Sequence, residues 1–235
     1  MIKNTLKPRV LLKDQLPILR SLVFPEGVNY LYKKTLKDPV NVNHCIEYYL
    51  HIGNRGDRML RTKEQLGYVI FSGIRSCSTT YSFRFIIQSE RTCEYLELRI
   101  NSFLDAQATA LSTISDTEFE SHKRAVVVKR LEKVNNLNQE TGRHWAQISN
   151  EYYDFEAAQE DAIHVKQLTK SDMMEFYSNH ILPSSPRRAK VVVYLEAQGT
   201  SAKTQEAASA DKEAETVPNK GIVPYLITEV REYKS

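Results

Sequence analysis

The chain has 235 residues, of which 41% are hydrophobic and 26% are charged, and its formal net charge is +3. A chain of this length and composition can bury the core of one large domain, or of one domain with appendages. The net charge is small and no block of five or more Lys or Arg residues occurs. Charge therefore gives no reason to expect binding to nucleic acid or to a membrane surface.

Signals that would send the chain into a membrane are not apparent. The start, MIKNTLKPRV, lacks the apolar stretch of a signal peptide, and no apolar run approaches the length of a membrane-spanning helix. The cysteines Cys45, Cys77 and Cys93 are few and unpatterned, which favours a reducing compartment. We therefore expect a cytoplasmic protein with no membrane partner, and a mitochondrial location is the alternative.

The first half of the chain is typical of β-structure. Residues 1–20 mix Lys, Pro and Leu, which indicates a linker or the end of an upstream domain. The turn signal Pro25-Glu26-Gly27 lies between two apolar stretches and predicts a hairpin. Alternating apolar residues predict a strand over 42–52, and two further strands are expected over 68–73 and 79–89.

The second half changes to helical periodicity. Apolar residues recur at helical spacing from Leu96 to Ile114, which predicts a first helix. The expected N-caps of three further helices are Ser115, which opens a capping box with Glu118, then Asn138, and then Thr169. The apolar stripes of these three helices would consist of Phe119, Val126, Val127, Leu131 and Val134, of Trp145, Ile148 and Tyr152, and of Met173, Tyr177 and Ile181.

A last strand and two terminal segments complete the expected organisation. Lys190–Glu196 (KVVVYLE) is rich in β-branched residues and predicts a strand that is buried on both faces. Residues 21–198 would then form an α+β domain in which helices pack on one face of a largely antiparallel sheet. The composition of residues 199–220 indicates a disordered linker, and residues 221–235 would be a truncated C-terminal segment.

The chain contains no complete set of catalytic or metal-ligating residues. None of its histidines is followed by another at the short spacing of a zinc motif. The nearest pattern, His44-Cys-Ile-Glu-Tyr48, has the H-x-x-E of an inverted zinc motif, but Tyr48 stands where a second His is needed. We therefore predict neither a catalytic residue nor a metal site in this chain.

The stretch LRTKEQLGYVIFSG, from Leu60 to Gly73, closely resembles the signature of the fourth, C-terminal domain of insulysins, which are inverted-motif zinc peptidases. The similarity covers nearly the whole chain, and fungal members are the most similar. It continues in RFIIQSE at 84–90, YLELRINSFL at 95–104, VVVKRLEK at 126–133, LTKSDMMEFYSNHIL at 168–182 and PRRAKVVVYL at 186–195.

The resemblance implies a protein of four related α+β domains whose two halves close around a peptide. The zinc ion and its ligands would belong to the first domain, so zinc is expected in the intact protein and not in this chain. By their match to the signature, Arg61 and Tyr68 would bind the substrate near the bond to be cleaved. The implied partners are peptide substrates, the catalytic N-terminal half and, in the intact protein, a second copy in a homodimer.

The chemistry of Arg61 and Tyr68 suits these implied roles. A guanidinium offers several fixed donors that can hold a peptide carbonyl. A phenol can donate a hydrogen bond to an oxyanion as it forms. The plainer explanation is that the arginine is a solvated charge at a helix end, and that the tyrosine packs at the start of a strand.

Two departures from the family pattern bear on function. Residues 51–59 are too few to hold the additional helix that family members have before the signature, so one helix is expected to be missing. Nothing matches the first three domains, so we expect a fragment that lacks the catalytic half and cleaves no peptide alone. The alternatives are a free-standing peptide- or protein-binding module and a core-type subunit of a processing peptidase. A nucleic-acid binder ranks lower, because the aromatic residues alternate into the core.

Overall fold

The computed structural model describes residues 22–54, 70–76, 80–149, 153–199 and 224–227. The strands are β1 (Asn29–Thr35), β2 (His44–Asn54), β3 (Ile70–Ser76), β4 (Thr80–Ser89), β5 (Ala189–Glu196) and β6 (Tyr225–Ile227). The helices are α2 (Cys93–Thr113), α3 (Asp116–Arg130), α4 (Leu137–Ser149), α5 (Ala157–Gln167) and α6 (Lys170–His180).

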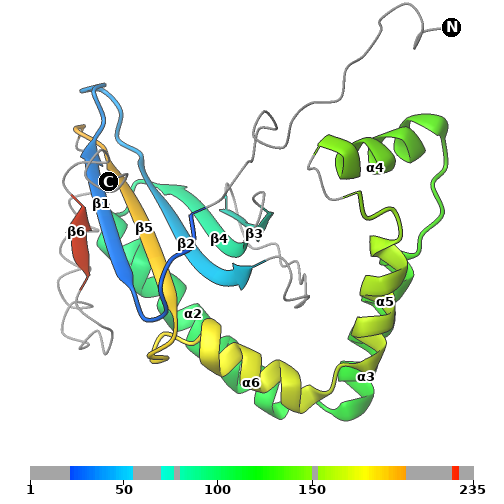
Figure 1. The fold of residues 1–235 in the computed structure, drawn as a ribbon. Coiled ribbons are helices and arrows are strands. Elements are labelled where there is room, and N and C mark those ends of the chain that lie inside the picture. Colours follow the sequence, from blue (N-terminus) through cyan, green and yellow to red (C-terminus); the bar gives the residue numbers. More distant parts are fainter. Residues whose placement is uncertain (1–21, 55–69, 77–79, 150–152, 200–223, 228–235) are drawn as a thin grey trace, which may run out of the picture.

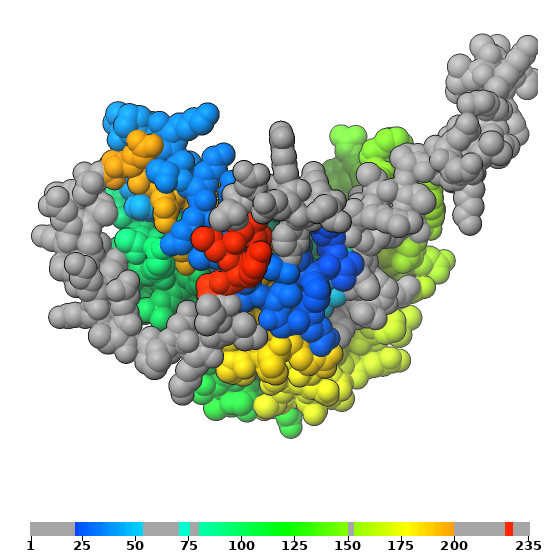
Figure 2. All heavy atoms as spheres, turned by 60° about the vertical axis from the view of Figure 1, so that its left-hand side comes forward, coloured from blue at the N-terminus to red at the C-terminus, as the bar shows by residue number. Residues whose placement is uncertain are grey.

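All six strands belong to one sheet, in the order β3-β4-β2-β5-β1-β6 (Figure 1). The pairs β3–β4, β4–β2 and β2–β5 are antiparallel, whereas β1 runs parallel to both β5 and β6. Figure 2 shows β6 in red beside β1 in blue. The largely antiparallel sheet is therefore confirmed, and its parallel end comes from chain segments that are distant in sequence.

The hairpin predicted around Pro25 is wrong, although the turn itself is present. Residues 22–24 form no strand, and β1 pairs with β5 and β6 instead of with its predecessor. Gly27 has a φ of +73°, and its N–H donates to the carbonyl of Arg187. The turn therefore attaches the start of β1 to the loop before β5, a contact that local sequence cannot indicate.

Two helices cover one face of the sheet, and three others form an extension (Figure 1). Helix α2 packs against β2 and β5, and α6 packs against α2 and β2. Helices α3 and α5 pack against each other beyond the edge of this layer, and α4 follows α3. We call α3, α4 and α5 the helical arm. The expected α+β fold, with helices packed on one face of the sheet, is confirmed.

The core lies between α2, α6 and the sheet. Strand β2 contributes Ile46, Tyr48 and Leu50, which are fully buried because they alternate onto the helix-covered face of a central strand. The apolar residues that pack against them come from α2, from α6 and its C-cap, from β4 and from β5: Leu96, Ile100, Leu104, Phe176, Ile181, Phe85, Val192 and Tyr194. Most of this core follows the predicted alternation in strands and the helical spacing in α2.

Buried polar residues tie α2 to the sheet. The carboxylate of Glu97 accepts hydrogen bonds from Lys190 and from the hydroxyl of Tyr194, both on β5. One turn further along α2, Asn101 accepts a hydrogen bond of 2.7 Å from the hydroxyl of Tyr48, and the same hydroxyl accepts from Arg188 over 2.9 Å. Every one of these side chains is buried. The contacts therefore fix the orientation of α2 on the sheet by directed bonds as well as by apolar packing.

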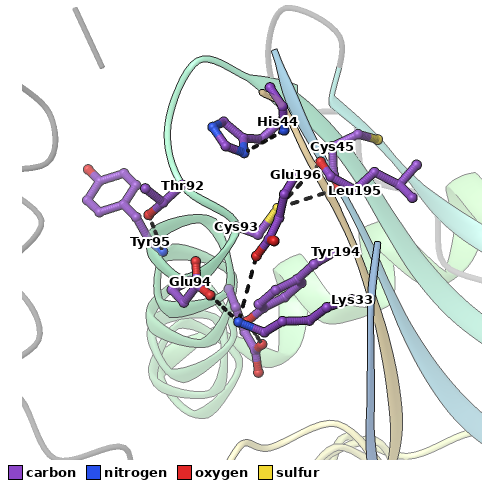
Figure 3. Close-up of polar contacts among 12 residues, drawn as sticks. Lys33, His44, Cys45, Thr92, Cys93, Glu94, Tyr95, Tyr194, Leu195 and Glu196 are labelled. Atoms are coloured by element: carbon purple, nitrogen blue, oxygen red, sulfur yellow. Dashed lines mark hydrogen bonds and ion pairs between the residues drawn. The ribbon is translucent and has the colours of Figure 1, made fainter. Parts of the chain in front are cut away.

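The N-terminus of α2 is attached in a similar way, as Figure 3 shows. The thiol of Cys93 lies 3.6 Å from the carbonyl oxygen of Cys45 and 3.9 Å from that of Leu195. Burial raises the pKa of this thiol to about 12, so it is an unreactive packing group. Nearer the surface, Lys33 forms ion pairs with Glu94 and Glu196.

The helix boundaries mostly agree with the capping signals. Ser115 and Thr169 are N-caps, and Thr169 forms a reciprocal capping box with Asp172. The cap of α4 is displaced from the predicted Asn138 to Asn136, whose side chain accepts from the N–H of Gln139. Helix α5 was not expected, because no capping side chain precedes it.

Several predictions fall on residues outside the described ranges. They are the terminal segment 1–20, the linker 199–220 apart from Gly199, the connection at 55–59 where a helix was expected to be missing, and all of 221–235 except residues 224–227. The described residues 225–227 form β6 and pair with β1. At least this part of the C-terminal segment therefore belongs to the folded sheet.

Candidate functional site

Arg61 and Tyr68, the two residues predicted to bind a peptide, lie outside the described residues. The end of the signature, from Ile70 to Gly73, is described and forms the start of β3. Strand β2 precedes the segment with the two residues, and β3 follows it. The described part of the candidate site therefore consists of the strands that flank the signature, together with β4, which lies between them in the sheet.

The face of this sheet that α2 and α6 do not cover bears a charged cluster, which we call the open-face cluster: Glu47, Phe71, Arg75 and Arg84. The pairing register places these side chains on the same side, because Phe71 and Glu47 both lie opposite Ile86, and Arg84 lies opposite Gly73. The carboxylate of Glu47 is 3.2 Å from Arg75 and 3.5 Å from Arg84. The Arg84 guanidinium stacks over the Phe71 ring, with its carbon 5.2 Å from the ring centroid.

The open-face cluster carries an excess of positive charge, because two guanidinium groups share one carboxylate. Ion pairs this accessible to water contribute little to stability. The Nε of Arg84 is buried and has no hydrogen-bond partner in the described part of the chain. That atom is out of reach of a bound peptide, but the Arg75 and Arg84 side chains are 47% and 27% exposed, and the accessible donors of a guanidinium can hold a peptide carbonyl or a carboxylate. The plainer role is to fix the edge strand β3 against β4 and β2.

A pocket of about 320 Å³ lies at the far end of β2, just before the signature segment. The register of β2 against β4 shifts between His51 and Gly53, and Gly53 has a φ of +152°. Such a bulge bends a strand and redirects its side chains. The pocket is lined by residues from five separate parts of the chain, among them Phe24, His51, Tyr81, His180 and Arg187.

Two histidines and an ion pair determine the electrostatics of this pocket. Arg187 binds the carboxylate of Glu26 through two hydrogen bonds of 2.7 and 2.9 Å, which hold the pKa of Glu26 below its usual value. Burial lowers the pKa of His51, whose Nδ1 has no partner among the described residues. Burial and then the charge of Arg187 lower the pKa of His180, and Glu26 opposes this effect. Both imidazoles are therefore neutral at neutral pH and can donate or accept hydrogen bonds.

The described residues do not form a metal site. No group of three or more His, Cys, Asp or Glu side chains converges among them. In the H-x-x-E stretch, His44 and Glu47 are three residues apart on a strand and so point to opposite faces. His44 accepts a hydrogen bond from the backbone N–H of Ala197, whereas Glu47 binds the two arginines.

Within the described ranges, no helix is both long enough and apolar enough to cross a membrane.

Sequence reasoning missed both the open-face cluster and the pocket. The only local signal for the cluster was polar alternation on the predicted strands, which places Arg84 and Glu47 outward without saying that they meet. Their contact depends on the β2–β4 register. The pocket depends on contacts between Glu26 and Arg187, which are far apart in the chain, and no local pattern indicates such a contact.

Comparisons with known proteins agree on one family. A family model described as "PQQ synthase PqqF-like, C-terminal lobe domain 4" matches residues 52–145, a range that includes the signature. The A-factor-processing enzyme of Saccharomyces cerevisiae is 35% identical over 198 residues, which are 77% of this chain and 19% of that protein. The insulin-degrading enzyme of Homo sapiens is 30% identical over 215 residues, which are 83% of this chain and 21% of that protein.

The fold is likewise similar to that of a solved structure. The crystal structure of pitrilysin superposes with a TM-score of 0.64 at 15% sequence identity, over 83% of this chain and 22% of that one. The chain therefore spans about a fifth of the length of the curated relatives that it matches.

Proposed function

Because this chain belongs to the insulysin-type zinc peptidases and corresponds to the fourth domain, in the C-terminal lobe, we propose that it is a non-catalytic, substrate-facing part of an enzyme that degrades or processes peptides. The observation that carries the proposal is the position of the match. The chain aligns over most of its own length with about a fifth of each relative, and the matching family model is that of domain 4.

Zinc would be held elsewhere in the intact protein. The described residues do not fit a zinc ion, since His44 and Glu47 lie on opposite faces and no third ligand joins either of them. No step of the reaction is therefore assigned to zinc on this chain. Its own contribution would be to bind a peptide and to position it against the catalytic half.

We assign peptide contact to Arg61 and Tyr68. Arg61 would hold a peptide carbonyl through its guanidinium donors, and Tyr68 would donate a hydrogen bond to the oxyanion that develops at the scissile carbonyl. The open-face cluster supports this assignment, because Phe71 lies at the end of the same signature and Arg75 directly after it on β3, and they present an aromatic ring and a guanidinium. Insulin and A-factor precursor peptides, which the names of the relatives suggest, are suitable first probes.

The test measures binding and catalysis separately. Fluorescence anisotropy of a labelled A-factor precursor peptide reports binding to the whole chain. Arg61→Ala should weaken this binding about tenfold or more, as expected for a lost hydrogen bond to a charged group. In an assembled relative that carries this chain as its last domain, Tyr68→Phe should lower kcat about ten- to a thousandfold. Tyr225→Phe, at the opposite edge of the sheet, is the matched control and should change neither quantity.

Two results would contradict the proposal. If Tyr68→Phe lowers the melting temperature and leaves the kinetics unchanged, the tyrosine is a structural strand residue. If the isolated chain cleaves the peptide and a chelator abolishes the cleavage, the chain is itself catalytic.

A further inference from the structure

The helical arm exposes much apolar surface. More than half of the large apolar side chains that are exposed among the described residues lie on the arm or its connections. Examples are Val128 on α3, Leu137, Trp145 and Ile148 on α4, Phe155 after α4, and Ile163 on α5. Large exposed apolar side chains that gather on one part of a soluble domain are a mark of an interaction site. In Figure 1 the arm lies at the far side of the molecule from β1 and β6.

Helix α4 shows the feature most clearly. It has 13 residues and buries none of them, although Leu137, Trp145 and Ile148 fall on one face at helical spacing. Leu137 is 75% exposed and Trp145 is 63% exposed. A helix of this length is marginal in water without tertiary packing, and Gly142 in its middle weakens it further. We call Leu137, Trp145 and Ile148 the arm stripe.

The contacts of α4 with other described residues are polar or peripheral, and the arm stripe stays exposed. Arg143 donates to the carbonyl of Glu132 over 3.2 Å, and the ring of His144 lies 5.8 Å from that of Phe155. These contacts position α4 beside its own connections. They bury no residue of α4.

We infer that the arm stripe is the docking surface for the neighbouring domain of the same C-terminal lobe. The chain matches domain 4 of that lobe and spans about a fifth of its relatives, so in a full-length protein the polypeptide continues into the partner. A covalently attached domain reaches the stripe at a high effective concentration. A second copy of the chain would have to find it by free diffusion. The partner surface is therefore an apolar patch on the adjoining domain.

This inference rests on the place of the chain in the lobe and not on peptide contact, so the two proposals can fail separately. The test compares the whole chain alone with a chimera, in which the chain replaces the matching 198-residue region of the A-factor-processing enzyme of Saccharomyces cerevisiae. Hydroxyl-radical footprinting followed by digestion and mass spectrometry measures how far each exposed side chain is oxidised, because each lies on a separate peptide. We expect Trp145 to be oxidised readily in the isolated chain and protected in the chimera. Tyr225, exposed on β6, is the internal reference.

A substitution makes the comparison quantitative. Leu137→Asp should leave the melting temperature of the isolated chain unchanged, because the residue is exposed, and should lower that of the chimera by several degrees. In a capture assay, the immobilised chain should bind the yeast enzyme truncated before the matched region, and Leu137→Asp should weaken this binding about tenfold or more. Val40→Asp, at a residue that is 82% exposed and lies in the β1–β2 connection, should have no effect in either assay.

Three outcomes would overturn the inference. The first is that Trp145 is oxidised equally in the isolated chain and in the chimera, and that Leu137→Asp changes neither the melting temperature of the chimera nor the binding in the capture assay. The second is that Trp145 is already protected in the isolated chain at dilutions where the chain is monomeric, which would mean that the chain covers its own arm stripe. The third is that the protection of Trp145 in the isolated chain rises with concentration as a dimer forms, which would mean that a second copy of the chain covers the arm stripe. If the chimera does not assemble, the capture assay decides, and failure of the unmodified chain to bind the truncated enzyme counts against the inference.

Discussion

The bond between Glu97 on α2 and Lys190 on β5 allows a sharp test of what holds the helix layer to the sheet. Glu97 is 8% exposed and Lys190 is 5% exposed, and the same carboxylate accepts from the hydroxyl of Tyr194. We predict that Glu97→Met lowers the free energy of unfolding by about 3–5 kcal/mol. The substitution keeps the length of the side chain but leaves a buried ammonium without its counter-charge.

A matched control lies on the same helix, three residues earlier. Glu94 bonds Lys33 over 2.5 Å and also joins α2 to the sheet, but these side chains are 46% and 39% exposed (Figure 3). Water screens such a pair, so Glu94→Met should cost less than about 1 kcal/mol. The two substitutions are chemically identical, and the difference between them measures the effect of burial on the ion pair together with the loss of the bond from Tyr194.

Urea unfolding of the whole chain, followed by circular dichroism, gives both free energies by linear extrapolation. The double variant Glu97→Met/Lys190→Met removes both charges and should recover most of the loss, because an apolar pair of similar volume can replace a buried ion pair. Equal costs for Glu94→Met and Glu97→Met would refute the reasoning. So would a double variant as unstable as the single one, since the loss would then come from packing and not from an unpaired charge.

Two further predictions concern the turn before β1 and the pocket. Gly27→Ala should destabilise the chain by at least about 1–2 kcal/mol in the same unfolding assay, because φ is +73° and the new Cβ would lie 2.6 Å from the carbonyl oxygen of Pro186. Gly142→Ala in α4 is the control: it has open space around it and should stabilise the chain by about 0.5–1 kcal/mol. A Gly27→Ala variant as stable as the unmodified chain would contradict the observed turn. Burial lowers the pKa of His51 in the folded chain, so its contribution to stability is fully present above the unfolded pKa of about 6.5 and is lost as the pH falls through the folded pKa. His51→Gln should therefore flatten the fall in stability measured by urea unfolding between neutral and mildly acidic pH, and an unchanged pH profile would count against a buried neutral imidazole.

Local patterns predicted most of the elements, because those elements are stabilised by signals within a few residues. Alternation gave β2 and β4 to within two residues, β-branched composition gave β5 to within one, and the capping signal at Thr169 gave the start of α6. Helix α5 was missed because it lacks a capping side chain. Its position is stabilised from outside, by packing on α3 and by the ion pair between Arg130 and Asp161.

Long-range pairing was beyond prediction. The β1–β5 pair joins Asn29 to Lys190 and the following residues in parallel, and nothing near either strand specifies the other. The site was affected in the same way, because the open-face cluster depends on the β2–β4 register and the pocket on the contact of Glu26 with Arg187. The predicted site residues Arg61 and Tyr68 came from a resemblance to the signature and stay predictions.

The polar residues of this domain have different consequences according to where they lie. Glu97, Lys190, Tyr48 and Arg188 are buried between α2 and the sheet, so changing one of them leaves a partner unsatisfied and affects stability first. The arm stripe is exposed and the open-face cluster is half-buried or exposed, so changes there should affect stability less and are free to affect binding. The same separation explains why an apolar stripe on α4 gave a misleading signal. Periodicity identifies the face of a helix that needs a partner, and in a domain that is a fifth of its relatives the partner need not be in the same domain.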